Sequence, residues 1–192
     1  MNIDIKALSP TLLADYLHFF DHVAFADHAD WAQCYCIHFH WKSEWDNEPP
    51  RSNRDRVVEC INNGIIRGYL AYVDGQVAGW CNANDKHAYS GLAERGELWE
   101  GNEDGCREKA VVCFLVAPDM RGKGIASALL AKACVDAAVE GYDYMEVYPP
   151  LGACDMYAAH HGTVSMCRRM GFVEHGTYTH DVRMRKRLSV VG

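Results

Sequence analysis

The stretch CYCIHFHW, residues 34–41, places two thiols and two imidazoles within eight residues. These residues alternate with aromatic and aliphatic ones, a period of two that is typical of a β-strand with one apolar face. Alternate residues of a strand lie about 6.6 Å apart, whereas zinc bonds to sulfur or nitrogen measure about 2.0–2.3 Å. The run therefore cannot close a tetrahedral metal site by itself, and no CxxC or HExxH motif supplies partners elsewhere. We expect no metal. The alternative is a metal- or redox-sensing protein that carries stoichiometric zinc on Cys34, Cys36, His38 and His40.

Residues 121–126, RGKGIA, have the chemistry of an anion-binding turn. Their spacing fits neither a Walker A loop nor a GxGxxG fingerprint, which excludes the two common nucleotide-binding motifs. The two glycines nevertheless let the backbone approach a ligand closely, and the free N–H groups of a helix N-terminus attract anions. Arg121 and Lys123 add positive charge. A diphosphate would fit this turn, and a plain strand-to-helix turn with solvated basic side chains is the alternative.

The elements that position this turn follow from the apolar pattern around it. Residues 109–118, KAVVCFLVAP, are typical of a strand buried on both faces. Residues 122–141 are typical of an amphipathic helix, whose apolar stripe consists of Ile125, Leu129, Ala133, Cys134 and Ala137. Downstream, the pattern predicts a strand at 142–150, a loop or short helix at 151–162, a helix at 163–171 and two closing strands within 172–188.

The N-terminal half has a less regular pattern. Residues 9–23 and 51–64 each predict a helix, the second ending on a glycine that suits a C-cap. Residues 67–83 predict two strands joined by a tight turn at Asp74-Gly75. The segment from 84 to 109 is polar and glycine-rich, and we expect a long loop with a helical turn there.

The sequence VAPDMRGKGIASALL resembles the cofactor-binding signature R/Q-x-x-G-x-G/A of the GNAT superfamily of N-acetyltransferases. Arg121, Gly124 and Ala126 stand at its defined positions. The stretch VDGQVAGW is similar to the hairpin strands that precede the signature in that family, and MCRRMGFVEHG is similar to the helix and strand that follow it. The resemblance covers most of residues 60–185.

This resemblance implies a GNAT-type α/β fold, a mixed central sheet flanked by helices, and acetyl-CoA as the acyl donor. In the family, the strand before the signature splays from the next strand, and the thioester sits in the V-shaped gap. The pantetheine arm would lie along the first strand and the diphosphate on the turn. The implied cofactor-binding residues are Phe114, Leu115, Val116, Arg121, Gly122, Lys123, Gly124, Ile125, Ala126 and Ser127.

The resemblance leaves alternatives open for the general acid and the general base. A lysine-like amine has a pKa of about 10.4, so forming the nucleophile near neutral pH benefits from a base. Many relatives carry a Tyr that acts as the general acid where this chain has Cys167, and relatives often have Asn where this chain has His160. The Cys167 thiol could donate the proton or be inert packing, and Tyr157 could replace it. Glu146 would be a base of raised pKa if it faced the cleft, and an ordinary surface residue if it faced solvent.

Composition narrows the remaining possibilities. The length of 192 residues, 49% of them hydrophobic, suits one domain over residues 1–192. No secretory pattern or long apolar run occurs, so we expect a cytoplasmic protein without a membrane partner. Nine irregularly spaced cysteines favour free thiols. Residues 1–100 carry 15 acidic against 8 basic residues, whereas residues 101–192 carry 11 of each. This balance disfavours nucleic acid and favours a cationic acceptor.

Together these observations predict an enzyme that transfers acetyl from acetyl-CoA to a primary amine of a small molecule or peptide. We expect the divergent residues 1–60 to form the acceptor side, with Cys36 and His38 binding the acceptor. A homodimer is compatible with the sequence. Two alternatives stay open: transfer of a longer acyl chain, and a non-catalytic acyl-CoA-binding sensor or interaction domain.

Overall fold

A seven-stranded mixed sheet forms the centre of the computed structural model, which describes residues 1–94, 105–152, 158–177 and 181–189. The strands lie in the order β1-β2-β3-β4-β5-β7-β6. Neighbouring strands are antiparallel except β4 and β5, which are parallel. The bounds are β1 Ile3–Ala7, β2 Gly68–Val73, β3 Gln76–Asp85, β4 Glu108–Val116, β5 Tyr144–Val147, β6 Val173–Thr177 and β7 Val182–Arg187.

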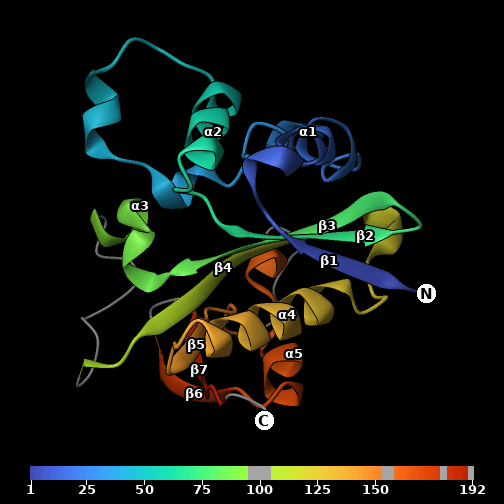
Figure 1. The fold of residues 1–192 in the computed structure, drawn as a ribbon, viewed down its shortest axis with the longest axis vertical. Coiled ribbons are helices and arrows are strands. Elements are labelled where there is room, and N and C mark those ends of the chain that lie inside the picture. Colours follow the sequence, from blue (N-terminus) through green and yellow to red (C-terminus); the bar gives the residue numbers. More distant parts are fainter. Residues whose placement is uncertain (95–104, 153–157, 178–180, 190–192) are drawn as a thin grey trace.

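Helices cover both faces of this sheet (Figure 1). α1 (Leu13–His18) and α2 (Asn53–Asn62) lie over one face, and α4 (Ile125–Val139) and α5 (Val164–Arg169) lie over the other. α3 (Ser90–Glu94) follows β3. Each face has its own apolar core, because the buried side chains form one cluster with the N-terminal helices and a second with α4 and α5. The predicted α/β architecture is confirmed.

Most elements around the glycine-rich turn are confirmed as well. α4 begins directly after Gly124, and all five residues of its predicted stripe are buried. The β2–β3 hairpin turns at Asp74 and Gly75, whose φ angles of 50° and 79° match the left-handed pair that such a turn requires. The Thr163 side chain accepts a hydrogen bond from the Met166 N–H and so caps α5.

The predicted strand at residues 34–41 is wrong. Tyr35 and Cys36 have φ angles of 44° and 49°, so the chain turns there, and Ile37–His40 form a single 3-10 turn. His40 is buried, whereas His38 is exposed. Tyr16 of α1 holds this segment in place by donating a hydrogen bond to the Tyr35 carbonyl at 2.7 Å. The thiols and imidazoles therefore do not share one face.

The sequence reading also missed β1, an edge strand that pairs with β2 from Ile3↔Val73 to Ala7↔Tyr69. Ile3 and Ile5 are half-buried and the other three residues are exposed, so the strand has no continuous apolar run. A short edge strand of this kind acquires its structure from the neighbour it pairs with, and local sequence carries little of that signal.

β4 contains the irregularity on which the candidate site depends. Opposite β3, Asn82 pairs with Cys113 while Ala83 pairs with Val111, so Val112 is an extra residue in β4. This β-bulge puts Val112 and Cys113 on the same face of the sheet, in the core that contains the N-terminal helices. Residues after the bulge therefore point to the opposite face from the one that a regular strand would give them.

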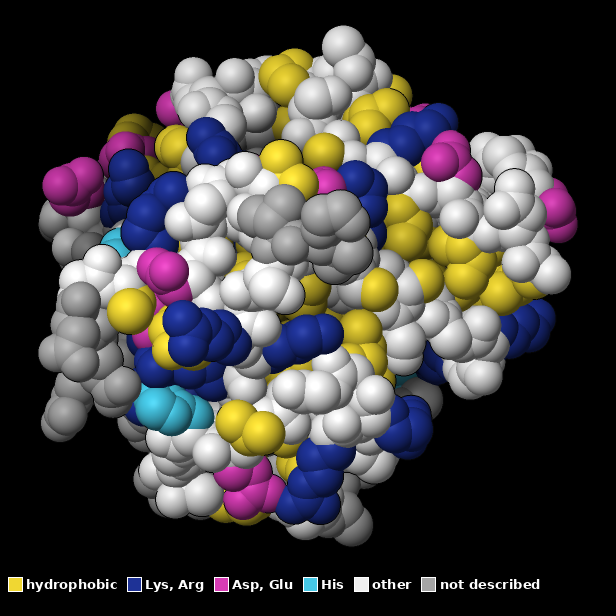
Figure 2. Space-filling model, turned by 60° about the horizontal axis from the view of Figure 1, so that its bottom comes forward, with side chains coloured by type: hydrophobic (Ala, Val, Ile, Leu, Met, Phe, Trp, Pro, Cys, Tyr) yellow, Lys and Arg dark blue, Asp and Glu magenta, His cyan; other side chains and the backbone are white. Residues whose placement is uncertain are grey.

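Figure 2 brings the C-terminal side of the molecule forward and shows Lys and Arg side chains in separate groups among acidic and apolar ones. Among the described residues, no helix has the length and apolar character needed to cross a bilayer.

Candidate active site

The two parallel strands separate along the second half of β4. β5 pairs with β4 only from Glu108↔Tyr144 to Val111↔Val147. β5 then ends, whereas β4 continues to Val116. Among the described residues, no strand pairs with the second half of β4 on the β5 side, so the two parallel strands part at the bulge.

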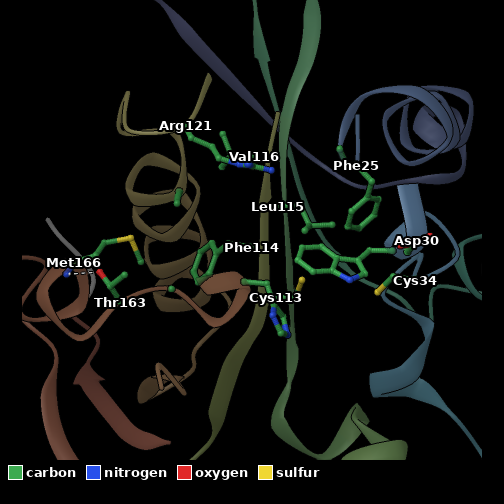
Figure 3. A pocket seen from close by; sticks show the side chains of 15 residues that line it. Phe25, Asp30, Cys34, Cys113, Phe114, Leu115, Val116, Arg121, Thr163 and Met166 are labelled. Atoms are coloured by element: carbon green, nitrogen blue, oxygen red, sulfur yellow. Dashed lines mark hydrogen bonds between the residues drawn. The ribbon is translucent and has the colours of Figure 1, made fainter. Parts of the chain in front are cut away.

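A cavity of about 460 Å³ opens along this part of β4 (Figure 3). Its walls come from three parts of the chain: the segment after α1, the end of β4 with the glycine-rich turn, and the region that leads into α5. The lining residues are Ala24, Phe25, Asp30, Trp31, Cys34, Cys113, Phe114, Leu115, Val116, Arg121, Ala126, His160, Gly162, Thr163 and Met166. Such a volume suits a small molecule or the arm of a larger one.

His161, the last residue of the 3-10 turn Ala158–His161, makes a hydrogen bond to β4 at the bulge. Its Nδ1 donates a hydrogen bond to the carbonyl oxygen of Val112, at 2.9 Å. Burial, followed by the neighbouring His160, lowers the pKa of His161 to about 4, so the ring is neutral near pH 7. The ring therefore satisfies the first β4 carbonyl beyond the paired region.

The glycine-rich turn has the geometry of an anion site. Gly122 and Gly124 have φ angles of 75° and 86°, a left-handed conformation that favours glycine. A Cβ atom at either position would meet no heavy atom within 4 Å, so the space above the turn is open. The first N–H groups of α4 have no acceptors within the helix, because a helix leaves its opening N–H groups unbonded. They can bind a diphosphate.

The side chain of Arg121 crosses from this turn to the N-terminal segment. Its guanidinium contacts both carboxylate oxygens of Asp27, at 2.5 and 3.2 Å. The Arg121 hydrogen bond holds the pKa of Asp27 below its usual value. Lys123 lies on the exposed side of the turn, with its Nζ 3.5 Å from Met120 Sδ. The turn and the N-terminal segment are thus joined beside the cavity.

The cysteines predicted on one strand face are divided between core and cavity. Cys36 is fully buried, and its thiol donates to Cys113 Sγ at 3.3 Å. Burial raises the pKa of Cys36 well above its usual value. Cys34 and Cys113 line the cavity, whereas Cys36 and His38, the predicted acceptor-binding pair, are not among its lining residues. No group of three metal-ligating side chains occurs in the described parts of the chain.

The sequence left two alternatives for Glu146, one facing the cleft and one facing solvent, and its side chain faces neither. It is fully buried, accepts from Tyr148 at 2.6 Å and from Arg185 at 2.9 Å, and lies 3.1 Å from Lys86 Nζ. Lys86 and Arg185 also contact Glu108. Burial alone would raise the pKa of Glu146, but the Tyr148 hydrogen bond and the two cations outweigh it, and the pKa is lowered. Glu146, Glu108, Lys86 and Arg185 form a buried ion cluster. Within it the pKa of Glu146 is lowered, whereas the sequence-based hypothesis of a general base required a raised pKa.

The other predicted catalytic residues have different locations. Cys167 on α5 is fully buried in the core beside α4, and burial raises the pKa of its thiol to about 12. Tyr157 lies outside the described residues. His160, at the position where relatives often have Asn, lines the cavity. Of the ten predicted cofactor-binding residues, those that line the cavity are Phe114, Leu115, Val116, Arg121 and Ala126.

The N-terminal wall of the cavity was not predicted residue by residue. Figure 3 shows Phe25, Asp30 and Cys34 on one side of β4, with Thr163 and Met166 on the other. Phe25 follows the helical region at 13–23, and Asp30 belongs to the short 3-10 turn at 29–31. The only sequence signal for this wall was the acidity and divergence of the N-terminal region.

Comparison with known proteins adds independent information. The acetyltransferase (GNAT) family model matches residues 23–163. No curated protein sequence matches the chain. Among solved structures, PaiA N-acetyltransferase from Thermoplasma acidophilum in complex with coenzyme A is 15% identical, with a TM-score of 0.57 over 97% of this chain and 99% of that one.

Two further solved structures have similar folds. The ribosomal-protein-S18-alanine N-acetyltransferase from Escherichia coli is 15% identical, with a TM-score of 0.53 over 100% of this chain and 97% of that one. The GNAT domain of PAT from S. lividans is 14% identical, with a TM-score of 0.58 over 96% of this chain and 89% of that one. At these identities the likeness concerns the fold.

Proposed function

The chain belongs to the acetyltransferase (GNAT) family, and on that premise we propose that it transfers the acetyl group of acetyl-CoA to a primary amine of a small molecule or a peptide. The observation that carries the proposal is a cavity that runs along the second half of β4 and reaches the open glycine turn at the start of α4, from which Arg121 and Ala126 line it. A donor with a diphosphate and a long thin arm needs both.

The donor is held by backbone more than by side chains. The diphosphate accepts hydrogen bonds from the N–H groups at the start of α4, and Arg121 and Lys123 add charge. The pantetheine arm follows Phe114, Leu115 and Val116, whose backbone edge on the β5 side pairs with no strand in the described part of the chain. The thioester then lies toward the bulge, at Val112 and Cys113.

The reaction joins the acceptor nitrogen to the thioester carbonyl carbon. The carbon–sulfur bond breaks, CoA leaves as its thiol with one proton, and the acetylated amine leaves as a neutral amide. The attacking amine must first lose a proton, and we assign its removal to His160, a cavity-lining imidazole of a residue type that titrates near neutral pH. Glu146 is not assigned this role, because it is enclosed by cations.

The acceptor would approach from the N-terminal side. Phe25, Trp31 and Cys34 line that part of the cavity. We therefore keep residues 1–60 as the acceptor side, but with these residues in place of Cys36 and His38 as the contacts.

Turnover with defined acceptors tests the proposal. The protein is incubated with acetyl-CoA and a panel of small primary amines and short peptides, and mass spectrometry detects a product heavier by one acetyl group. We expect at least one acetylated product, and slower formation by the Arg121→Ala/Lys123→Ala variant at low acetyl-CoA. Binding of acetyl-CoA without product from any amine would contradict the proposal and favour a non-catalytic acyl-CoA sensor. Faster turnover with a longer acyl-CoA would revise the donor alone.

A further inference from the structure

The carboxylate of Asp30 is the feature of the cavity that the transfer chemistry does not use. Among the described residues, no hydrogen bond or ion pair of the Asp30 side chain is present, although it lines the cavity. Its neighbour Asp27, three residues earlier, is paired with Arg121. Arg121 is also the only Lys or Arg among the lining residues. The cavity therefore has one exposed carboxylate on its wall that forms no ion pair with a Lys, Arg or His among the described residues.

The wall between this carboxylate and β4 is apolar. Figure 3 shows Leu115 and Phe25 between β4 and Asp30. Trp31 lines the same part of the cavity and stacks on His28, with ring centroids 4.2 Å apart. Such a surface suits a chain of methylene groups or an aromatic ring, and it gives a charged group no partner before Asp30 is reached.

The chemistry of transfer restricts which positive charge Asp30 can bind. A carboxylate beside an ammonium group stabilises its protonated form and raises its pKa. If Asp30 held the attacking nitrogen, it would oppose the deprotonation that attack requires. Its natural partner is therefore a second cation on the acceptor, separated from the reacting amine by the apolar wall.

From this geometry, and resting on the proposed function, we propose that the acceptor is a primary amine with a second positive charge separated by an apolar spacer, and that Asp30 binds that second charge. The reacting amine then points toward the bulge at Cys113, and the spacer lies against Phe25, Trp31 and Leu115. Asp30 is thus a specificity-determining residue, which contacts the substrate remote from the bond that forms.

Three acceptors of equal chain length test this proposal: 1,5-diaminopentane, pentylamine and 5-aminopentanoate. Each has five carbons, and the far end is an ammonium, a methyl or a carboxylate group; the two equivalent amines of the diamine account for a factor of two only. For the wild-type protein we expect kcat/KM to be roughly tenfold higher for the diamine than for pentylamine, the low end of what a hydrogen bond to a charged group contributes. The aminopentanoate should be the poorest, because its carboxylate meets that of Asp30. Most of the difference should be in KM, because this contact is made before and during the reaction alike.

Matched variants separate the site from a general charge effect. Asp30→Asn should abolish the preference for the diamine, whereas Asp74→Asn should retain it. Asp74 lies in the β2–β3 turn outside the cavity, and its left-handed φ of 50° is one that Asn tolerates. Stabilisation of Asp30→Asn by acetyl-CoA in thermal unfolding would show that the variant is folded.

The outcomes distinguish this proposal from the one on which it rests. Equal acetylation of pentylamine and the diamine, or a preference that survives in Asp30→Asn, would overturn the role of Asp30 while leaving acetyl transfer intact. No acetylation of any of the three amines or of the wider panel, with acetyl-CoA still bound, would overturn both.

Discussion

Arg121 of the glycine-rich turn and Asp27 of the N-terminal segment, 94 residues apart in the chain, form a two-pronged ion pair beside the candidate active site. The side chains are 37% and 32% exposed, so the pair lies at the surface. Its position sets up a competition, because the diphosphate of acetyl-CoA and the Asp27 carboxylate would both use the same guanidinium.

Removal of the Asp27 charge should therefore tighten cofactor binding. We expect Asp27→Asn to lower the dissociation constant of acetyl-CoA several-fold in isothermal titration, because Arg121 is released and one nearby negative charge is lost. Asp119→Asn is the matched control: it removes an exposed carboxylate close to the same turn that has no ion-pair partner among the described residues. An equal increase in acetyl-CoA affinity in both variants would attribute the effect to the overall electrostatic potential near the turn. Weaker binding by Asp27→Asn would contradict the competition.

The buried ion cluster should prove structural and not catalytic. Glu146→Gln leaves Lys86 and Arg185 with one carboxylate, Glu108, in a site without solvent. Removing one partner of a buried pair costs about 3–5 kcal/mol, and urea unfolding should show a loss of that order. Glu140→Gln breaks the Lys109 pair, in which the Glu140 side chain is 44% exposed, and should cost no more than about 1 kcal/mol.

The lowered pKa of Glu146 also predicts how the difference in unfolding free energy between wild type and Glu146→Gln depends on pH. A carboxyl whose pKa is lower in the folded state contributes stability above its unfolded pKa, about 4.3, and loses it as pH falls through the folded value. The gap in unfolding free energy between wild type and Glu146→Gln should thus be full at pH 7 and narrow below about pH 4. A base of raised pKa would instead give a gap that changes sign or shrinks above pH 5.

Buried histidines should make the fold less stable in mild acid. Burial lowers the pKa of His40 to about 4, from an ordinary value of 6.5. A histidine with a lowered folded pKa contributes stability that is complete above 6.5 and is lost as pH falls toward 4, because the unfolded chain binds the proton first. Unfolding at pH 7 and pH 5 should show this decline in the wild type and a shallower one in His40→Gln. The exposed His22 offers the control, since His22→Gln should decline like the wild type.

The glycine turn and its flanking elements could be predicted from sequence because their signals are local. Residues 110–117, which include most of β4, are a continuous apolar run, Gly122 and Gly124 mark a left-handed turn, and the α4 stripe recurs with helical spacing. The same holds for the Asp74-Gly75 hairpin. These features place the donor side of the site, and the family signature adds the identity of the donor.

The acceptor side could not be predicted in the same way. The alternation in residues 34–41 predicts a strand, but a contact from α1 and left-handed φ angles at Tyr35 and Cys36 determine the structure instead. Neither Tyr nor Cys is a residue type that favours such angles, so the sequence gives no sign of them. The contacts of Glu146 come from residues 86, 148 and 185, and the second carboxylate of the cluster is at residue 108, so these distant positions in the chain conceal the cluster. Asp30 lines the cavity only because the 29–31 turn faces β4 across the fold.

Binding of acetyl-CoA to the glycine turn is the central claim, and one measurement tests it most directly: chemical unfolding of the wild type, Gly124→Ala and Gly64→Ala with and without acetyl-CoA. Both glycines are left-handed, with φ of 86° and 66°, and a Cβ at either meets nothing within 4 Å, so the two variants suffer comparable backbone strain. Ligand at 100 times its Kd should stabilise the wild type by about 2.7 kcal/mol. We predict that Gly64→Ala keeps this stabilisation and that Gly124→Ala loses most of it. No stabilisation of the wild type at millimolar acetyl-CoA, or equal stabilisation of both variants, would contradict the account.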